Sequence, residues 1–138
     1  MQIANELEEL ADDSRSTQFA RLKLQSKDLI LQQPCLGANF IMGRAGTSLC
    51  FVPLTSVLEI IGLENAPQRP VSFDSVLSAQ QEPIKIHYQL PESLSTGWLL
   101  TVSEPWLRLA HPQGVIWVPI SRVTYAEIPN PKESWISK

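Results

Sequence analysis

Short apolar runs separated by turn-forming residues dominate the pattern of hydrophobic and polar positions along most of the chain. Four such runs, interrupted by proline and glycine, occupy positions 29–31, 39–42, 49–52 and 57–61. Five more follow at positions 83–90, 97–102, 106–109, 115–118 and 124–128. Apolar runs of this length between turn residues are typical of β-strands. The pattern therefore predicts a mainly β protein with nine short strands.

Two segments depart from this β pattern and predict helices. The first runs from Asn5 to about Leu24, where Asn5 and Glu8 form a capping box at the positive end of the helix dipole. Its apolar positions follow a three- and four-residue spacing at 3, 7, 10 and 11. The second runs from Ser72 to about Gln81, and Ser72 caps its N-terminus. The apolar stripe of this second helix consists of Phe73, Val76 and Leu77.

One short pattern occurs twice and indicates an internal repeat. Val52–Val57 and Val118–Val123 both read valine, proline, aliphatic, hydroxyl, any residue, valine. We call the difference between their positions (118 − 52), which is 66, the repeat offset. The residue before each copy is aromatic, Phe51 in one and Trp117 in the other.

Duplication of a β unit explains this match, and the alternative is that the pattern only marks strand ends in two unrelated hairpins. Because proline cannot donate a hydrogen bond to a neighbouring strand, each copy predicts an edge, a bulge or a sharp bend.

The repeat divides the chain into two β units joined by a polar linker. Residues 64–70 carry two prolines and are the predicted linker. We expect residues 1–65 to hold the first helix and the first β unit, and residues 71–128 to hold the second helix and the second β unit. Residues 129–138 are the predicted tail. Short strands bent in the middle build small closed barrels, so two such barrels are expected.

A helix followed by five short strands resembles the Sm-like small-barrel fold. The likeness is carried by Gly97-x-Leu99-x-x-Val102, which is similar to the first Sm motif, and by residues 116–123, which occupy the place of the second. The whole chain also resembles a set of uncharacterised actinobacterial proteins, through residues 15–22 and the strand at 52–57. The resemblance implies a mainly β protein with short helices, built from two tandem Sm-like or SH3-like small β-barrel units, each preceded by a helix.

The departures from the Sm pattern bear on function. RNA-binding Sm proteins carry an asparagine in the loop after the second strand, whereas residues 103–106 contain none. They also carry Arg-Gly in the loop before the last strand, where this chain has Pro119-Ile120, with Pro53-Leu54 at the same place in the first copy. The resemblance therefore supports the fold and argues against RNA binding as the function.

Composition and charge narrow the classes of partner. Hydrophobic residues make up 43% of the chain and charged residues 18%, which is enough apolar material for a core. The formal net charge is −3, and the eleven lysines and arginines are scattered without a basic run. Nucleic-acid-binding proteins concentrate basic residues on one face, because each neutralised phosphate releases counterions. Nucleic acid is thus an alternative partner and not the favoured one.

Neither a membrane segment nor a secretory leader is readable. The longest uncharged stretch, residues 29–42, is too short and too polar to span a bilayer as a helix. The first residues are acidic and lack a basic leader followed by an apolar segment, so a cytoplasmic location without membrane contact is expected. Cys35 and Cys50 lack C-x-x-C spacing, and buried reduced thiols are favoured over a disulfide or a metal pair.

The sequence carries no recognisable catalytic or metal-binding arrangement. His87 and His111 are each isolated from cysteine, aspartate or glutamate at metal-ligand spacing. Segment 43–46 lacks the Lys-Ser/Thr pair of a phosphate loop and predicts a hairpin turn. Glu59 and Glu127 lie near the ends of the two repeats and invite a paired-carboxylate site, but solvent-facing strand positions are favoured. We therefore expect no catalytic residue, no metal, no cofactor and no enzymatic activity.

Aromatic and basic residues of the second unit offer one candidate binding surface. Trp106, Trp117 and Tyr125 come from neighbouring predicted strands, and Arg108 alternates with Trp106 onto one face. With the nearby cations, the candidate patch consists of Lys85, Trp106, Arg108, Trp117, Arg122 and Tyr125. Such a patch can stack bases or receive a partner helix, and the competing interpretation is that the rings fill the core between two barrels. We expect a non-catalytic protein-interaction or regulatory module that binds protein, with self-association left open as one form of that binding. The alternative is binding of RNA or single-stranded nucleic acid through the second unit.

Overall fold

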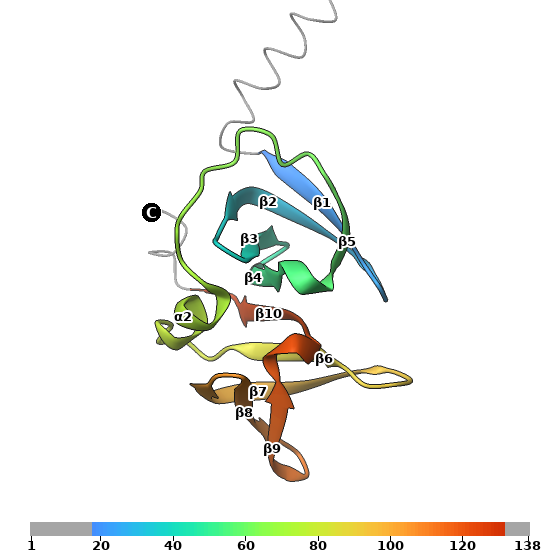
Figure 1. The fold of residues 1–138 in the computed structure, drawn as a ribbon, viewed down its shortest axis with the longest axis vertical. Coiled ribbons are helices and arrows are strands. Elements are labelled where there is room, and N and C mark those ends of the chain that lie inside the picture. Colours follow the sequence, from blue (N-terminus) through green and yellow to red (C-terminus); the bar gives the residue numbers. More distant parts are fainter. Residues whose placement is uncertain (1–17, 132–138) are drawn as a thin grey trace, which may run out of the picture.

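Strands make up most of the structure, a computed structural model that describes residues 18–131 (Figure 1). Ten antiparallel strands form one sheet, and one α-helix and two 3-10 turns complete the described elements. The strands are β1 (Phe19–Leu24), β2 (Asp28–Leu36), β3 (Phe40–Ala45), β4 (Ser48–Pro53), β5 (Val57–Ile61), β6 (Lys85–Gln89), β7 (Leu94–Ser103), β8 (Trp106–His111), β9 (Gly114–Pro119) and β10 (Val123–Pro129). The helix is α2 (Phe73–Ser78), and the 3-10 turns are η1 (Leu54–Ser56) and η2 (Ile120–Arg122). The prediction of a mainly β protein is confirmed.

The nine predicted strands are found, whereas the first predicted helix is wrong over its described part. Each predicted apolar run overlaps one of the strands β2 to β10. Residues 19–24, expected as the end of a helix, form β1, in which Ala20, Leu22 and Leu24 are buried and the residues between them are exposed. A period of two is the geometry of a strand, and it turns these three side chains onto the core face. The remainder of that predicted helix, residues 5–17, lies outside the described residues.

The second predicted helix is confirmed as α2, although it is shorter than expected and ends at Ser78. Ser72 caps it, since its side-chain oxygen accepts a hydrogen bond from a backbone N–H of the first turn. Phe73 and Leu77 are buried on the side that faces the sheet. The backbone N–H of Phe73 also donates to Oδ1 of Asn39 at 2.7 Å, which ties the helix to the start of β3. Within the described residues, no helix is long and apolar enough to cross a bilayer.

Residues 62–72, which connect β5 to α2 and include the predicted linker at 64–70, run against β2. Leu36 at the end of β2 donates its backbone N–H to the carbonyl of Pro67 at 2.8 Å. The carbonyl of Leu36 accepts from the backbone N–H of Arg69, also at 2.8 Å. These two bonds hold the linker to β2 and set the place where α2 begins.

Pro53 and Pro119 end β4 and β9 and turn the chain into η1 and η2. Their backbones match, with φ −65° and ψ 139° at Pro53 and φ −62° and ψ 139° at Pro119. The fixed φ of proline suits this extended position before a tight turn. The sharp bend predicted at each proline is confirmed.

The strand order repeats within the sheet. Along the sheet the order is β5-β1-β2-β3-β4-β10-β6-β7-β8-β9. The last five strands follow the order of the first five when β6 to β10 are matched with β1 to β5. The first residues of β6 and β1 differ by the repeat offset (85 − 19), and the same offset separates β7 from β2, β8 from β3, β9 from β4 and β10 from β5. We call β1 to β5 the N-terminal half and α2 to β10 the C-terminal half.

β4 and β10 pair in antiparallel register and join the two halves, and we call this pairing the seam. The opposed residues are Ala126 and Phe51, Glu127 and Cys50, Ile128 and Leu49, and Pro129 and Ser48. The core of the N-terminal half includes one residue from β10, which is Tyr125. The core of the C-terminal half includes three residues from β3 and β4, which are Phe40, Leu49 and Phe51. The two halves therefore share their cores across the seam.

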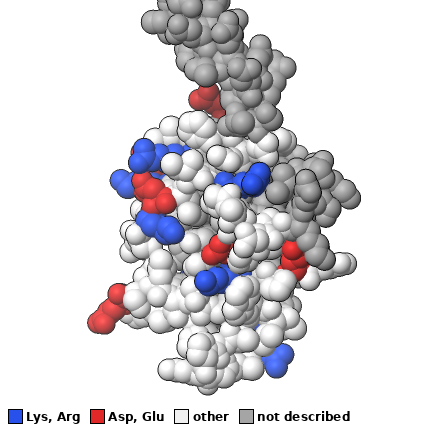
Figure 2. All heavy atoms as spheres, turned by 180° about the vertical axis from the view of Figure 1, so that it is seen from behind, with Lys and Arg blue, Asp and Glu red and all other residues white. Residues whose placement is uncertain are grey.

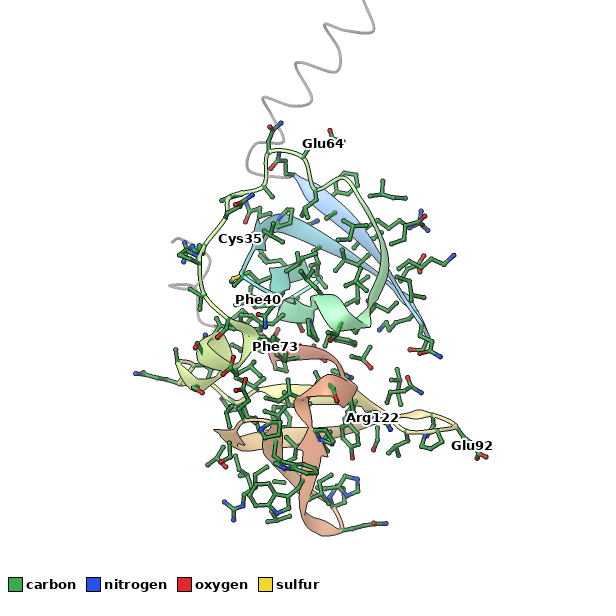
Figure 3. The ribbon with its side chains drawn as sticks, in the orientation of Figure 1. Cys35, Phe40, Glu64, Phe73, Glu92 and Arg122 are labelled. Carbon is green, nitrogen blue, oxygen red and sulfur yellow. The ribbon has the colours of Figure 1, made fainter. Side chains whose placement is uncertain are left out.

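Aromatic rings fill the junction beside the seam. Figure 3 shows Phe40 from β3 and Phe73 from α2 meeting between the halves, and their ring centroids are 6.1 Å apart. The ring of Phe51 lies 6.3 Å from that of Phe40, and all three rings are buried. Tilted aromatic pairs at this spacing contribute about 0.5–1.5 kcal/mol each beyond the burial of their area. The junction is thus part of the core rather than a wet contact between two separate bodies.

Candidate functional site

Three of the chain's four tryptophans lie on the outer face of β7, β8 and β9. Side chains alternate along β8, so Trp106 and Arg108 point outward while Leu107 and Leu109 are fully buried. Strand pairing places Trp117 of β9 directly opposite Arg108. On the other side, Trp98 of β7 is opposite Lys85 of β6. We call this surface the tryptophan face, and it consists of Lys85, Trp98, Trp106, Arg108, Val115 and Trp117.

The large side chains of the tryptophan face are exposed to solvent. Trp98 and Trp106 are each 43% exposed, and Val115 and Trp117 are 52% and 54% exposed. The interpretation that these tryptophans fill a core between two barrels is therefore wrong for Trp106 and Trp117. Single exposed apolar residues are ordinary, but a contiguous apolar patch on a small protein marks an interaction site. The face is the leading candidate for a binding surface.

Charged side chains are sparse around this face. Residues 18–131 contain eight acidic and eight basic side chains. Figure 2 shows them interspersed rather than gathered by sign, and the lower part of that view, over the C-terminal strands, is mostly uncharged. Among the basic residues that the structure describes, Lys85 and Arg108 belong to the tryptophan face. The tryptophan face is therefore mainly apolar, with Arg108 at its centre and Lys85 at its edge.

Two residues of the predicted patch lie elsewhere. Arg122 is on η2, near the junction of the two halves in Figure 3. The prediction that Tyr125 lies on a strand beside Trp106 and Trp117 is wrong, because β10 pairs with β4 and β6 and not with β8 or β9. The side chain of Tyr125 is buried in the core of the N-terminal half. Trp98 was missed by the sequence pattern, since residues 98–100 are three successive apolar residues that hide the alternation of the strand.

His87 and Glu127 form a second candidate site, next to the seam. Nε2 of His87 lies 2.6 Å from Oε1 of Glu127. The His87 ring stacks on Tyr125 with 4.1 Å between centroids, and the Tyr125 hydroxyl accepts a hydrogen bond from Nζ of Lys27 at 3.3 Å. The expectation that Glu127 faces solvent is wrong, because it is half-buried and bonded to His87. Glu59 is exposed, as expected.

Burial and hydrogen bonding set the protonation states around this pair. Burial lowers the pKa of His87, and the bond to Glu127 offsets part of that effect. Burial alone raises the pKa of Glu127, but hydrogen bonds from Ser48 and His87 outweigh it and the pKa is lowered. A neutral His87 therefore donates its Nε2–H to an ionised Glu127. Burial also raises the pKa of the Cys50 thiol to about 12, so this free cysteine is neutral and unreactive. The other cysteine, Cys35, is also free and is half-buried.

The pair lacks the other parts of a catalytic or metal site. Within residues 18–131, no cluster of three or more His, Cys, Asp or Glu side chains is placed to hold a metal ion. A hollow of about 350 Å³ between α2 and β7 is lined by Leu77, Glu82, Ile84, Leu99 and their neighbours, and neither His87 nor Glu127 reaches it. Catalysis requires a base and a reacting group near one another in a cleft. Within the described residues, what the histidine pair does is join β6 to β10 beside the seam.

Comparison with known proteins adds no relative to these observations. The chain matches no protein-family model and no curated protein. Its function is therefore argued from the tryptophan face, the seam and the two edges of the sheet.

Proposed function

We propose that this chain is a non-catalytic protein-interaction module, built from two Sm-like units at residues 1–65 and 71–128, that binds its partner through the tryptophan face. The observation that carries the proposal is the exposure of Trp98, Trp106 and Trp117 together on one side of the sheet. Tryptophan is enriched at the centres of protein interfaces, where a few buried rings supply most of the binding energy. Three such rings on one face have the composition of an interface core.

The repeated strand order supports two units. Matched strands begin at the constant repeat offset, so no residue is inserted or deleted between one strand start and the next. Each half also places a 3-10 turn between its last two strands, directly after a proline. A tandem duplication produces this kind of fixed offset. The C-terminal half, with α2 followed by five strands, agrees with the resemblance to the Sm-like fold.

The area that the face offers supplies a substantial share of a binding energy. A tryptophan that passes from about half exposed to buried removes about 100 Å² of surface from water, which contributes about 2–3 kcal/mol. Three rings therefore contribute about 6–9 kcal/mol before the entropic cost of association is subtracted. That cost is about 4–15 kcal/mol, so a specific contact also needs the surrounding residues and the backbone of the sheet edge.

Sparse charge favours a protein partner over nucleic acid. Single-stranded nucleic acid is a second candidate, because Arg108 lies among rings on which bases can stack. Affinity for a phosphate backbone grows with the number of phosphates that cations neutralise. With Lys85 and Arg108 as the cations of the face, that contribution is small.

Acrylamide quenching of the three tryptophans tests the proposal in the full chain. A Trp135→Phe background removes the fourth tryptophan, and the other three are replaced biosynthetically by 5-hydroxytryptophan, which is excited at longer wavelength than tryptophan, so that the fluorescence reports the face alone even in a protein extract. The protein is titrated in three series: with itself, with a nuclease-treated protein extract of the source cells, and with oligouridylate at about 50 mM salt, where electrostatic affinity is high. The matched control is Phe19→Ser with Ile30→Ser, which removes exposed apolar side chains from the N-terminal half instead.

A protein partner is expected to reduce quenching in the first or the second series, and the control variant is expected to behave like the parent. Protection by oligouridylate alone would replace the proposal with the nucleic-acid alternative. Tryptophans that stay equally quenchable in all three series would overturn the proposal.

A further inference from the structure

Among residues 18–131, the sheet ends in two edge strands that pair on one side only, β5 and β9. On β5, Leu58 and Ile61 are 66% and 57% exposed, and on β9 the exposed apolar residues are Val115 and Trp117. A strand at the edge of a sheet presents unpaired backbone N–H and C=O groups, and apolar side chains along it favour pairing with another strand. Both edges are suited to such pairing.

The seam shows how the counterparts of these edges pair. By the repeat offset, β4 is the counterpart of β9, and β5 is the counterpart of β10. Within the chain β4 and β10 pair in antiparallel register, with Phe51 opposite Ala126 and both residues fully buried. The two edges that stay open are therefore the counterparts of the two edges that already join.

The tryptophan face is the open counterpart of a surface that the seam buries. The repeat offset matches Phe40 with Trp106 (106 − 40), Leu49 with Val115, and Phe51 with Trp117. The first member of each pair is one of the residues that the N-terminal half contributes to the core of the C-terminal half. The second member of each pair is exposed. The matched positions carry large apolar side chains in both halves. Within the described residues, the C-terminal half covers the side chains of the N-terminal half, and no element covers those of the C-terminal half.

The surface that does the covering also has a counterpart. At the seam, Phe73 of α2 and Ala126 of β10 lie against the rings of the N-terminal half. Subtracting the repeat offset from their positions gives Leu7 (73 − 66) and Ile60 (126 − 66). Ile60 lies on the open edge strand β5 and is exposed, and Leu7 belongs to the apolar positions of the N-terminal segment. Within the described residues, β5 of another copy thus carries an exposed apolar residue, Ile60, at the position that corresponds to Ala126.

We propose that a second copy of this chain docks on the tryptophan face, with its β5 paired antiparallel to β9. This inference rests on the proposed function, because it names the partner of the same face. The register follows from the seam when each residue is carried over by the repeat offset. It places Ile60 of the second copy opposite Trp117 (126 − 66 and 51 + 66), and Ile61 of the second copy opposite Ile116 (127 − 66 and 50 + 66).

The contact is head to tail, because β5 and β9 are different surfaces of the same chain. After one copy docks, its own β9 is still open and the β5 of the first copy is still open. A contact of this type repeats until the copies close into a ring or extend as a filament. Trp106 and Trp117 of each copy are then buried as Phe40 and Phe51 are buried at the seam.

Disulfide cross-linking between two chains that each carry one added cysteine tests the register. Both full-length chains carry Cys35→Ser, and Cys50 is kept because it is buried and free. One chain carries Ile61→Cys and the other Ile116→Cys, since directly opposed residues in antiparallel strands have Cα atoms about 4.5–5.5 Å apart, which a disulfide can span. The matched control replaces Ile61→Cys by Leu58→Cys, which moves the thiol three residues along the strand, about 10 Å out of register.

The mixture of Ile61→Cys and Ile116→Cys chains is expected to give the disulfide-linked dimer as its main product, while each chain alone and the Leu58→Cys mixture stay monomeric on a non-reducing gel. Equal cross-linking in the Leu58→Cys mixture would overturn the register. No cross-link in any mixture, together with light scattering that gives the mass of one chain at the highest concentration reached, would overturn the second copy as partner.

A pair of charge substitutions separates loss of docking from loss of folding. Ile61→Lys places a charge on the open edge, and Ile30→Lys places one on β2 at a residue of similar exposure, 54% against 57%. Light scattering is expected to show two or more chains per particle for Ile30→Lys and one chain for Ile61→Lys. Protection of the tryptophans by cell extract but not by the chain itself would keep the proposed function and reject the second copy.

Discussion

Truncation of Phe51 tests whether the two halves of the sheet share one core. Phe51 belongs to β4 of the N-terminal half, yet its ring is fully buried in the core of the C-terminal half, 6.3 Å from the ring of Phe40. Replacing a buried phenylalanine by alanine removes its apolar burial and leaves a cavity, which costs about 3–5 kcal/mol. In a chain of 138 residues each kcal/mol lowers Tm by about 3–4 °C, so Phe51→Ala should lower Tm by about 10–20 °C.

Two probes follow the halves separately during urea unfolding in a Cys35→Ser background. Labelling of Cys50 reports opening of the N-terminal core, because this thiol is buried there and its pKa is raised to about 12. Hydrogen exchange of β8 reports opening of the C-terminal core, where Leu107 and Leu109 are fully buried. Phe51→Ala is expected to lower the urea midpoint of both probes by the same amount.

The control for this experiment is Leu58→Ala, which truncates an exposed residue of the edge strand and should change stability by about 0.5 kcal/mol or less. If Phe51→Ala lowers the midpoint of one probe and leaves the other at its original value, the halves unfold independently. That result would refute the shared core, because a residue of β4 whose ring is buried in the C-terminal core must couple the two halves.

Acid should weaken the fold through His87, because burial lowers the pKa of this side chain from its ordinary value of 6.5. Below pH 6.5 the unfolded chain therefore binds more protons than the folded chain, and the free energy of unfolding falls as the pH falls. The lowered pKa of Glu127 adds a second loss of stability as the pH falls below 4.5. His87→Asn should flatten the pH dependence of the urea midpoint below about pH 6.5. An unchanged slope would contradict the role given to His87. Gly43→Ala should lower stability by about 1–3 kcal/mol in thermal unfolding, because strands β2 and β3 are close there and overpacking must move one of them. A Cβ at Gly43 would lie 2.8 Å from Cβ of Leu31, so an unchanged Tm would show that the two strands separate freely. Ser72→Ala should lower stability by about 1 kcal/mol through loss of the α2 cap, and Ser72→Asp should restore it, as measured by urea unfolding with hydrogen exchange of α2.

Residues 19–24 were wrongly predicted as helix because the prediction used the local spacing of apolar residues and did not apply the repeat offset to this segment. Residues 19–24 follow a well-capped helical pattern with no glycine or proline between them, so the local pattern extends the helix through them. The repeat offset, applied to the whole chain, matches Phe19–Leu24 with positions 85–90, which alternate clearly as a strand. The signal is present in the sequence, but the Val-Pro pattern alone covers too little of the chain to reveal it.

Other features depend on contacts that no local pattern carries. Pairing of β4 with β10, and of His87 with Glu127, joins residues far apart in the chain, and period-two alternation identifies which side chains share a face without saying what lies against it. The exposure of Trp106 and Trp117 is a case of this kind. Large aromatic residues are usually buried, so burial is the default expectation for them, and only the absence of a neighbouring element in the described residues makes these two exposed.

The linker at residues 62–72, held to β2 through the backbone of Leu36, makes the seam an intramolecular contact. A short tether of this kind keeps two docking surfaces at an effective concentration in roughly the millimolar range. The seam therefore forms however dilute the protein is, whereas the same pairing between separate chains follows mass action. In the assembly proposed above, each chain would enter as a preassembled pair of units, and the protein concentration would decide how far the pairing continues beyond it.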